Sequence, residues 1–361
     1  MSQLTEREIL AALSRVNDPE LNRDLVSLNM VQNVRIDGDG GVKLRIDLTT
    51  PACPLKGKIQ GDVENALRAL PGVTGVDIEW GAQVRRGPSQ DKGVNFIPGV
   101  KNVVLVGAGK GGVGKSTVAL NLAAALALDG ARVGLLDADF YGPSVPIMTG
   151  ITQRPTSKDG RTLEPLEAHG LKVMSIGFLV EPDQAMVWRG PMLHSAITQL
   201  LRDVNWGELD YLVLDLPPGT GDVPLSLAQI VKAAGVVLVS TPQDVAIADV
   251  IKARSMFDRV NVPILGIVEN MSGFVCPHCN ETTPIFSTGG TGRAAEAMSI
   301  PLLGRIPLDL AIRIGGDTGA PVTAAYPDSQ QAQAFREMAR NVAGRISVQA
   351  HQVKLPVFNL G

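Results

Sequence analysis

The chain of 361 residues is poor in cysteine, in aromatic side chains and in net charge. Three cysteines, a small and odd number, argue against a disulfide framework and favour a reducing compartment, so we expect a cytoplasmic protein. Aromatic residues make up only 4% of the chain, which argues against a surface that stacks on sugars or bases. The near balance of 33 Lys and Arg against 36 Asp and Glu predicts no nucleic-acid partner and no polybasic membrane surface.

Long apolar runs are also missing. None reaches the roughly 18–20 residues that span a bilayer, and the N-terminus lacks the charged and apolar regions of a secretory signal, so we expect no membrane partner. Hydrophobic residues nevertheless make up 45% of the chain, which is enough for packed cores, and the length fits one large and one small domain. The 39 glycines and 24 prolines favour an α/β protein with many tight loops.

Residues 1–84 predict a small α+β domain with the element order α-β-β-α-β. Thr5-Glu-Arg-Glu8 is a capping box that begins a helix, and Asp37–Gly41 is typical of a hairpin turn. The expected elements are a helix to about Val16, strands Val31–Ile36 and Val42–Leu48, a helix after Pro54, and a strand Val73–Trp80.

Residues 85–98 are polar and rich in structure breakers, and we interpret them as a linker. Residues 99–345 predict a larger domain in which short apolar strands alternate with helices, the pattern of a mostly parallel, doubly wound sheet. We expect a last helix over Ser329–Arg345, a tail over 346–361, and a loop or simple turn at Gly315–Gly319. The expected strands are Val103–Val106, Val133–Leu136, Val173–Ile176, Tyr211–Leu214, Val236–Ser240 and Ile264–Val268.

The segment from Gly109 to Thr117 fits the P-loop pattern and lies in the required context, after an apolar strand and before a helix. Its glycines let backbone N–H groups converge on phosphate oxygens, Lys115 reaches the β- and γ-phosphates, and Ser116 offers a hydroxyl to Mg²⁺. Gly107-x-Gly109-x-x-Gly112 also matches a dinucleotide fingerprint, but Lys115-Ser116 in register favours a nucleoside triphosphate. The predicted nucleotide-binding residues are Gly109, Lys110, Gly111, Gly112, Val113, Gly114, Lys115, Ser116 and Thr117.

The extra lysine in this loop, Lys110, makes the segment resemble the deviant Walker A family, which includes the nitrogenase iron protein and septum-site and chromosome-partition ATPases. In that family the second lysine reaches the nucleotide of a partner subunit. The resemblance therefore implies that Lys110 acts in catalysis with Lys115, and that the ATP-bound protein is a homodimer.

Carboxylates follow two predicted strands, where a parallel sheet faces its ligand crevice. Asp215 fits the Walker B position, holding Mg²⁺ directly or through water. By resemblance, Asp139 positions the attacking water and Asn270 contacts the adenine, while Asp137 holds either the loop or the metal. No guanine-binding motif is present, which favours ATP over GTP.

Cys276-Pro-His-Cys279 is the second chemical feature of the chain. Three interpretations compete: a redox dithiol, a zinc site, and a site shared by two subunits. A redox dithiol usually begins a helix in a thioredoxin-like unit, and a closed zinc site needs two more ligands than this motif offers. Two thiolates from each of two copies would make four, enough for a tetrahedral metal or a 4Fe–4S cluster.

In combination, Gly109–Thr117, Asp137–Ser144, Asp215–Asp222 and Cys276–Cys279 resemble the Mrp/ApbC-type ATPases, which act as iron–sulfur cluster carriers. This resemblance covers about two thirds of the chain. It implies an ATP-hydrolysing homodimer that holds a labile 4Fe–4S cluster between Cys276 and Cys279 of both copies and passes it to apoproteins. Two alternatives remain: a positioning or partition-type switch ATPase, and an ATP-gated electron-transfer protein resembling the nitrogenase iron protein.

The first domain resembles the small domain of cluster-targeting and PaaD-type proteins, through Asp18–Leu21, Leu25–Asn29 and Thr49–Pro54. Cys53 precedes a predicted helix, whose dipole could lower the pKa of the thiol. It is either a contact for a cluster or client or a structural cysteine, and we assign it no required role.

Overall fold

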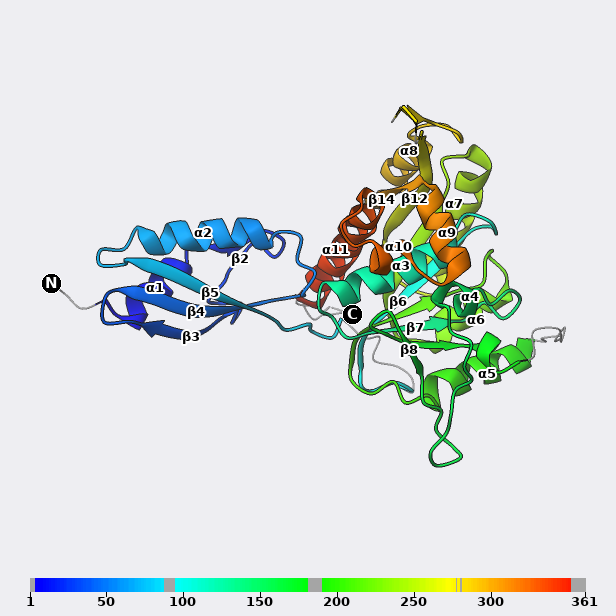
Figure 1. Ribbon diagram of the computed structural model, residues 1–361, viewed down its shortest axis with the longest axis horizontal. Coiled ribbons are helices and arrows are strands. Elements are labelled where there is room, and N and C mark those ends of the chain that lie inside the picture. The colour runs from blue at the N-terminus through cyan, green and yellow to red at the C-terminus, as the bar shows by residue number, and fades with distance from the viewer. Residues whose placement is uncertain (1–3, 88–94, 181–189, 277, 280, 352–361) are drawn as a thin grey trace, which may run out of the picture. The chain divides into compact units, whose positions relative to one another are not determined.

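The computed structural model describes residues 4–87, 95–180, 190–276, 278–279 and 281–351. Part of the expected linker (88–94), Pro277 of the cysteine motif, Asn280 directly after it, and residues 352–361 of the expected tail lie outside the described residues. The chain divides into two compact units (Figure 1): residues 1–87 with residues 343–361, and residues 88–342.

The small unit has a three-stranded sheet in the order β3-β4-β5, with β3 and β4 antiparallel and β4 and β5 parallel. Alternate residues of β4 are buried, and their side chains form one core with the apolar faces of the two helices. The elements are α1 (Glu6–Leu13), β1 (Asn17–Asp18), β2 (Arg23–Asp24), β3 (Val31–Ile36), β4 (Gly41–Leu48), α2 (Lys56–Arg68) and β5 (Gly75–Ala82).

Two local predictions for this unit are confirmed. The Thr5 hydroxyl accepts a hydrogen bond from the Glu8 N–H and the Glu8 carboxylate accepts one from the Thr5 N–H, which completes the capping box. The turn closes with a bond of 2.8 Å from Asp37 N to Gly41 O. The first helix is shorter than expected, however, because the Val16 carbonyl accepts a bond from Leu25 N and the next two residues pair as β1 with β2.

The large unit is a nine-stranded sheet in the order β13-β12-β11-β6-β10-β7-β9-β8, with β14 also paired to β12. Among the strands that the structure describes in this sheet, the pairings of β8 with β9 and of β13 with β12 are antiparallel and the others are parallel. All six expected strands are present, whereas β8, β13 and β14 were not expected. The strands are β6 (Val100–Ala108), β7 (Val133–Asp137), β8 (Leu166–Ala168), β9 (Leu171–Ser175), β10 (Leu209–Asp215), β11 (Ala233–Ser240), β12 (Ile264–Val275), β13 (Thr282–Thr283) and β14 (Leu302–Leu308).

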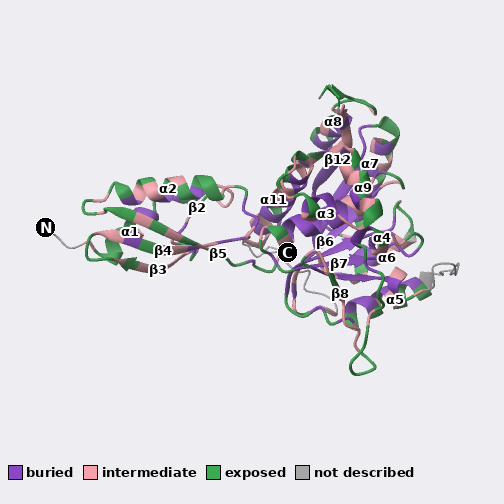
Figure 2. Cartoon of the chain, viewed as in Figure 1, coloured by how far each residue is buried: buried purple, intermediate pink, exposed green. Residues whose placement is uncertain are grey.

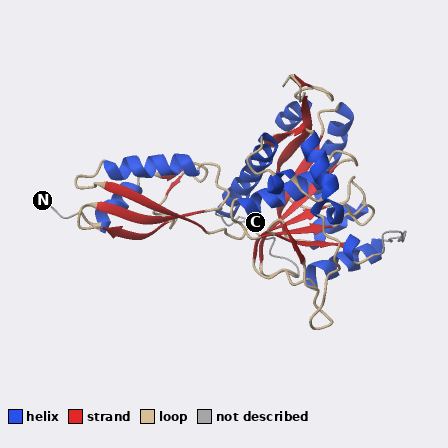
Figure 3. Cartoon of the chain, viewed as in Figure 1, coloured by secondary structure: helices blue, strands red, loops and turns tan. Residues whose placement is uncertain are grey.

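Helices cover this sheet (Figure 3), and its central strands are buried along almost their whole length (Figure 2). The helix after the P-loop, α3, packs against β6, β7 and β10, while α7 packs against β6, β11 and β12. The helices are α3 (Lys115–Leu128), α4 (Val145–Thr149), η1 (Ile176–Phe178), α5 (Gly190–Arg202), α6 (Asp222–Ile230), α7 (Asp244–Arg259), α8 (Gly290–Ala297), α9 (Leu310–Thr318), α10 (Val322–Ala325) and α11 (Gln330–His351).

Two expectations for the C-terminal region are wrong. Residues 315–318 are the end of α9, not a loop, and Gly319 is the C-cap of that helix. The last helix, α11, continues to His351, so the first six residues of the expected tail are helical. Asp129, the C-cap of α3, ties α11 to the P-loop helix by accepting bonds from Arg336 Nη2 (2.6 Å) and Arg340 Nε (3.0 Å).

The close approach of α4 and α9 predicts that Gly319→Ala destabilises the large unit. Gly319 has φ +72°, and a Cβ there would meet the backbone N of Gly150 at 2.6 Å. We expect the free energy of unfolding to fall by about 2 kcal/mol or more. Gly316→Ala is the matched control within α9, since its Cβ would meet only Met148 Cε at 3.9 Å. It should be neutral or gain about 0.5–1 kcal/mol. Urea denaturation measures both, and equal stabilities of the two variants would contradict the argument.

Candidate functional site

The P-loop joins β6 to α3 at the carboxyl edge of the sheet. Gly114, the N-cap of α3, has φ +81°, a conformation that favours glycine. The Asn270 side chain fills the position where a Cβ on Gly114 would lie, so the loop and β12 are in direct contact. The loop amides and the helix N-terminus together form an arrangement suited to an anion.

Lys115, the first residue of α3, lies between the end of β10 and the loop that follows β7. Its side chain is 6% exposed, and its Nζ lies 2.6 Å from Asp215 Oδ1, 3.2 Å from Ser116 Oγ and 3.7 Å from Asp139 Oδ2. The second carboxylate oxygen of Asp215 is buried and has no hydrogen-bond partner among the described residues. Sequence reasoning named all four of these residues, and the structure places them together.

Asp137 holds the loop that carries Asp139. Its carboxylate accepts bonds from Asp139 N (3.1 Å), Val145 N (3.2 Å) and Ser175 Oγ (3.0 Å). Burial, together with the nearby charge of Asp215, raises the pKa of Asp137. Asp137 is predicted to hold either the loop or the metal, and its contacts support the role of holding the loop.

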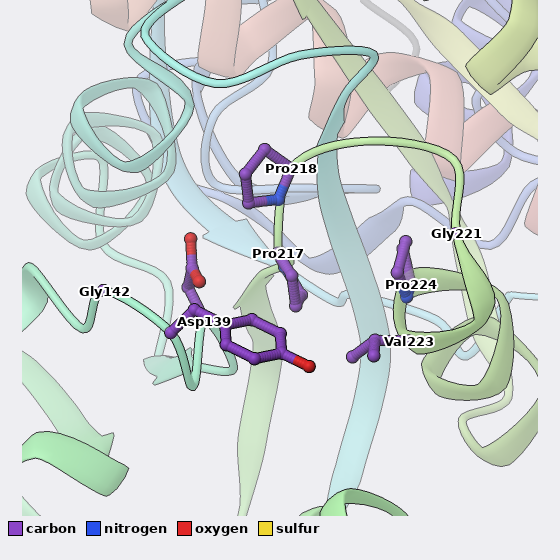
Figure 4. A pocket seen from close by; sticks show the side chains of 8 residues that line it. Asp139, Gly142, Pro217, Pro218, Gly221, Val223 and Pro224 are labelled. Atoms are coloured by element: carbon purple, nitrogen blue, oxygen red, sulfur yellow. The ribbon is translucent and has the colours of Figure 1, made fainter. Parts of the chain in front are cut away.

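Asp139 borders a cavity of about 450 Å³ beside the P-loop. Figure 4 shows Asp139 and Gly142 on one side of it and Pro217, Pro218 and Val223 on the other. Burial raises the pKa of Asp139, and the positive charge of Lys115 opposes that shift. The cavity therefore has a carboxylate on one wall and apolar proline rings on the other.

Three further residues that the sequence predicts for the nucleotide site lie outside the group around Lys115. Lys110 is half-buried, and its ammonium group has no ion pair or hydrogen bond with any described residue. Asn270 donates from Nδ2 to the Val113 carbonyl at 2.8 Å, so in this structure it contacts the loop backbone. The Thr117 carbonyl accepts a bond from Asn121 Nδ2 at 2.9 Å.

Sequence reasoning missed residues that support the loop from a distance. Ser175, which binds Asp137, lies 38 residues away from it. Thr323 donates to Asn121 Oδ1 from both its N–H and its hydroxyl, across 202 residues. Neither pair has a local sequence signal, because each partner is an ordinary polar residue until the fold brings the two together.

The two motif cysteines lie at the tip of a hairpin formed by β12 and β13. Phe274 and Val275 pair with Thr283 and Thr282, and Cys276 N donates to Glu281 O at 3.0 Å. Cys276 is half-buried and Cys279 is exposed. Bonds from the backbone N–H of His278, and then from Cys279, lower the pKa of Cys276. Among the described residues no cluster of three or more His, Cys, Asp or Glu could hold a metal, so the hairpin offers two thiols per chain.

Cys53 is not a low-pKa thiol. It is 8% exposed in the core of the small unit, and burial raises its pKa to about 11. The expected effect of the helix dipole is therefore overturned: the N–H groups of Leu55 and Lys56 lower the pKa, but burial outweighs them.

The sheet, the P-loop and the strand-end carboxylates define a P-loop nucleoside triphosphatase. Residues 99–343 match the family described as NUBPL iron-transfer P-loop NTPase, and residues 6–79 match the iron–sulfur cluster assembly protein family. No helix in the described part of the chain has the length and hydropathy needed to cross a membrane.

Relatives are similar over almost the whole chain. The iron–sulfur cluster carrier protein of Deinococcus radiodurans is 57% identical over 94% of this chain and 95% of its own length. That of Escherichia coli K12 is 44% identical over 94% of this chain and 91% of its own. A solved nucleotide-binding protein from Archaeoglobus fulgidus, in complex with ADP, is 40% identical with a TM-score of 0.58, and covers 66% of this chain and 93% of that chain. The chain belongs to the Mrp/ApbC/NUBPL family of iron–sulfur cluster carrier proteins.

The different environments of the three thiols predict different reaction rates with a thiol reagent. At pH 8 and without denaturant, we expect Cys279 and Cys276 to react rapidly with DTNB and Cys53 to react only slowly, because it is buried and protonated. In urea all three should react. Cys53→Ala should remove the slow phase and leave the fast phase unchanged. A fast phase of three thiols in the native protein would contradict this placement of Cys53.

Proposed function

We propose that this protein binds and slowly hydrolyses ATP, and that it carries a labile 4Fe–4S cluster between two copies of the chain and transfers it to apo iron–sulfur proteins. The observation that carries the proposal is the pair of thiols at the tip of the β12–β13 hairpin, on a P-loop unit. A 4Fe–4S cluster needs four thiolates. Two copies related by a twofold axis supply that number.

The nucleotide is assigned to the loop between β6 and α3. Lys115 would bind the β- and γ-phosphates and stabilise the charge that develops between them. Asp139, beside the cavity, would orient the attacking water, and Asn270 would approach the adenine from β12. That the Archaeoglobus relative was solved with ADP supports a nucleotide at this loop.

The residues around Lys115 also fit a magnesium ion. The buried second oxygen of Asp215, without a partner among the described residues, and the Ser116 hydroxyl are hard oxygen ligands of the kind that Mg²⁺ prefers. When bound, the ion would neutralise charge on the phosphate oxygens.

Lys110 is assigned to the partner's nucleotide. It extends from a tight loop, and no described residue of its own chain pairs with its charge. If Lys110 completes the nucleotide site only in the dimer, formation of the dimer would depend on bound ATP. The cluster would then be held or released according to the nucleotide state of both copies.

The cluster assignment predicts the result of anaerobic reconstitution with iron and sulfide. Wild type should gain about four iron and four sulfide per two chains, with the visible and Mössbauer spectra of a 4Fe–4S cluster. The double variant Cys276→Ala/Cys279→Ala should gain none, whereas Cys53→Ala, the matched control, should load normally. Loss of the colour to an apo-ferredoxin would then test transfer. Stoichiometric zinc or a disulfide in place of a cluster would refute the carrier assignment for this hairpin.

The assignment of Lys110 predicts a defect in dimerisation rather than in nucleotide binding. With Mg²⁺ and ATPγS, we expect Lys110→Ala to dimerise about tenfold or more weakly, as for the loss of one charge-assisted contact, while the Kd for nucleotide changes little. Lys115→Ala should lose nucleotide binding itself. Lys158→Ala is the control, because that side chain is 83% exposed in the same unit. Sedimentation and nucleotide titration measure the two quantities, and wild-type dimerisation of Lys110→Ala would exclude a lysine acting across the interface.

A further inference from the structure

Strand β12 is irregular where it passes the P-loop. Its register with β14 pairs Asn270 with Ile306 and Phe274 with Leu308, so Met271, Ser272 and Gly273 lie opposite Pro307 alone. Proline has no N–H to donate to the ladder, which accounts for the interruption at this point. Met271 has φ +58°, a left-handed conformation that costs a non-glycine residue about 1 kcal/mol or more. We call Met271–Gly273 the β12 bulge.

The bulge turns two consecutive side chains towards the P-loop. In a regular strand, neighbouring side chains point to opposite faces. Here Asn270 Nδ2 donates to the Val113 carbonyl, and Met271 Cε lies 3.8 Å from the position of a Cβ on Gly114. Bulges beside active sites commonly re-aim side chains in this way. Both contacts fall on the loop residues that immediately precede Lys115.

On its other side the bulge is attached to the cysteine hairpin. Ser272 Oγ donates to Ile306 O at 3.1 Å, which fixes the bulge to β14. Phe274 then pairs with both β13 and β14, and Cys276 N donates to Glu281 O. Only four residues separate Met271 from Cys276, and backbone or side-chain bonds hold the chain at successive points along that path.

We propose that the β12 bulge passes the nucleotide state of the P-loop to the cysteine hairpin, and that Met271 is its positioning residue. The inference rests on the proposed function, in which the loop binds ATP and the hairpin binds the cluster. A phosphate drawn to the loop amides and Lys115 rearranges the backbone at Val113 and Gly114. Since Asn270 bonds to the Val113 carbonyl and the Met271 side chain lies beside Gly114, the bulge moves with the loop, and relief of the left-handed strain at Met271 favours a second conformation. A ligand that favours one of two such states shifts the population.

The test is hydrogen exchange of the full-length, cluster-free protein, with and without Mg²⁺ and ATPγS. In wild type, nucleotide should change the exchange rate of the described hairpin amides, residues 274–276, 278–279 and 281–283, by about threefold or more. Met271→Ala should bind nucleotide with a similar Kd, protect the P-loop amides normally and lose the hairpin response. Met271→Leu, which keeps the side-chain bulk, should recover most of it. Met192→Ala is the control, a half-exposed methionine on α5.

Ser272→Ala provides a second variant, since it removes only the bond to Ile306 O and should also weaken the response. A hairpin that responds fully in Met271→Ala, or that does not respond in wild type with nucleotide bound, would overturn the inference alone. A protein that binds no nucleotide would overturn both the inference and the proposed ATPase. A hairpin that responds but never loads a cluster would uphold the coupling and refute the proposed cargo.

Discussion

The ammonium group of Lys115 and the carboxylate of Asp215 form a buried ion pair at 2.6 Å, and the carboxyl edge of the large sheet is organised around it. A buried charge without a partner costs several kcal/mol, so the pair fixes the first turn of α3 relative to the end of β10. The Asp215 carbonyl also accepts a bond from Ala138 N, which ties the end of β7 to the same point. A phosphate that competes for Lys115 would therefore act on α3 and on the ends of β7 and β10 at once.

This constraint explains why the loops at that edge are held so tightly. The Asp137 carboxylate accepts bonds from two backbone amides and one hydroxyl, and the two amides offset part of the rise in its pKa that burial causes. Asp139 is left to face the cavity, between charge on one side and proline rings on the other. The P-loop helix is fixed at its far end by Asp129 and two arginines of α11.

The three cysteine thiols lie in two different environments, a buried core and a hairpin tip. Cys53 is enclosed in the apolar core of the small unit, where the charged form is unfavourable, and this suits a structural role. Cys276 and Cys279 lie on a hairpin tip, where backbone N–H groups favour the thiolate of Cys276. Cys279 is exposed and Cys276 is half-buried, so a second copy of the chain or a client could reach this pair of thiols at the hairpin tip. In the proposed function, the short path from the P-loop to this hairpin through β12 would let bound nucleotide act on the cluster.

The sequence by itself determined the features whose causes are local. The capping box at Thr5, the hairpin at Asp37–Gly41, the P-loop and the strand-end aspartates each depend on residues close together in the chain, so their patterns could be recognised directly. The burial of Cys53, the bond from Ser175 to Asp137, the contact of Asn270 with Val113 and the strand β14 were decided only by the tertiary structure. Each of these depends on groups far apart in the sequence, and the pKa of a thiol or the partner of a polar side chain is set by what the fold places around it. The helical end of α9 shows the same limit, because packing against α4 outweighs the low helix propensity of its glycines.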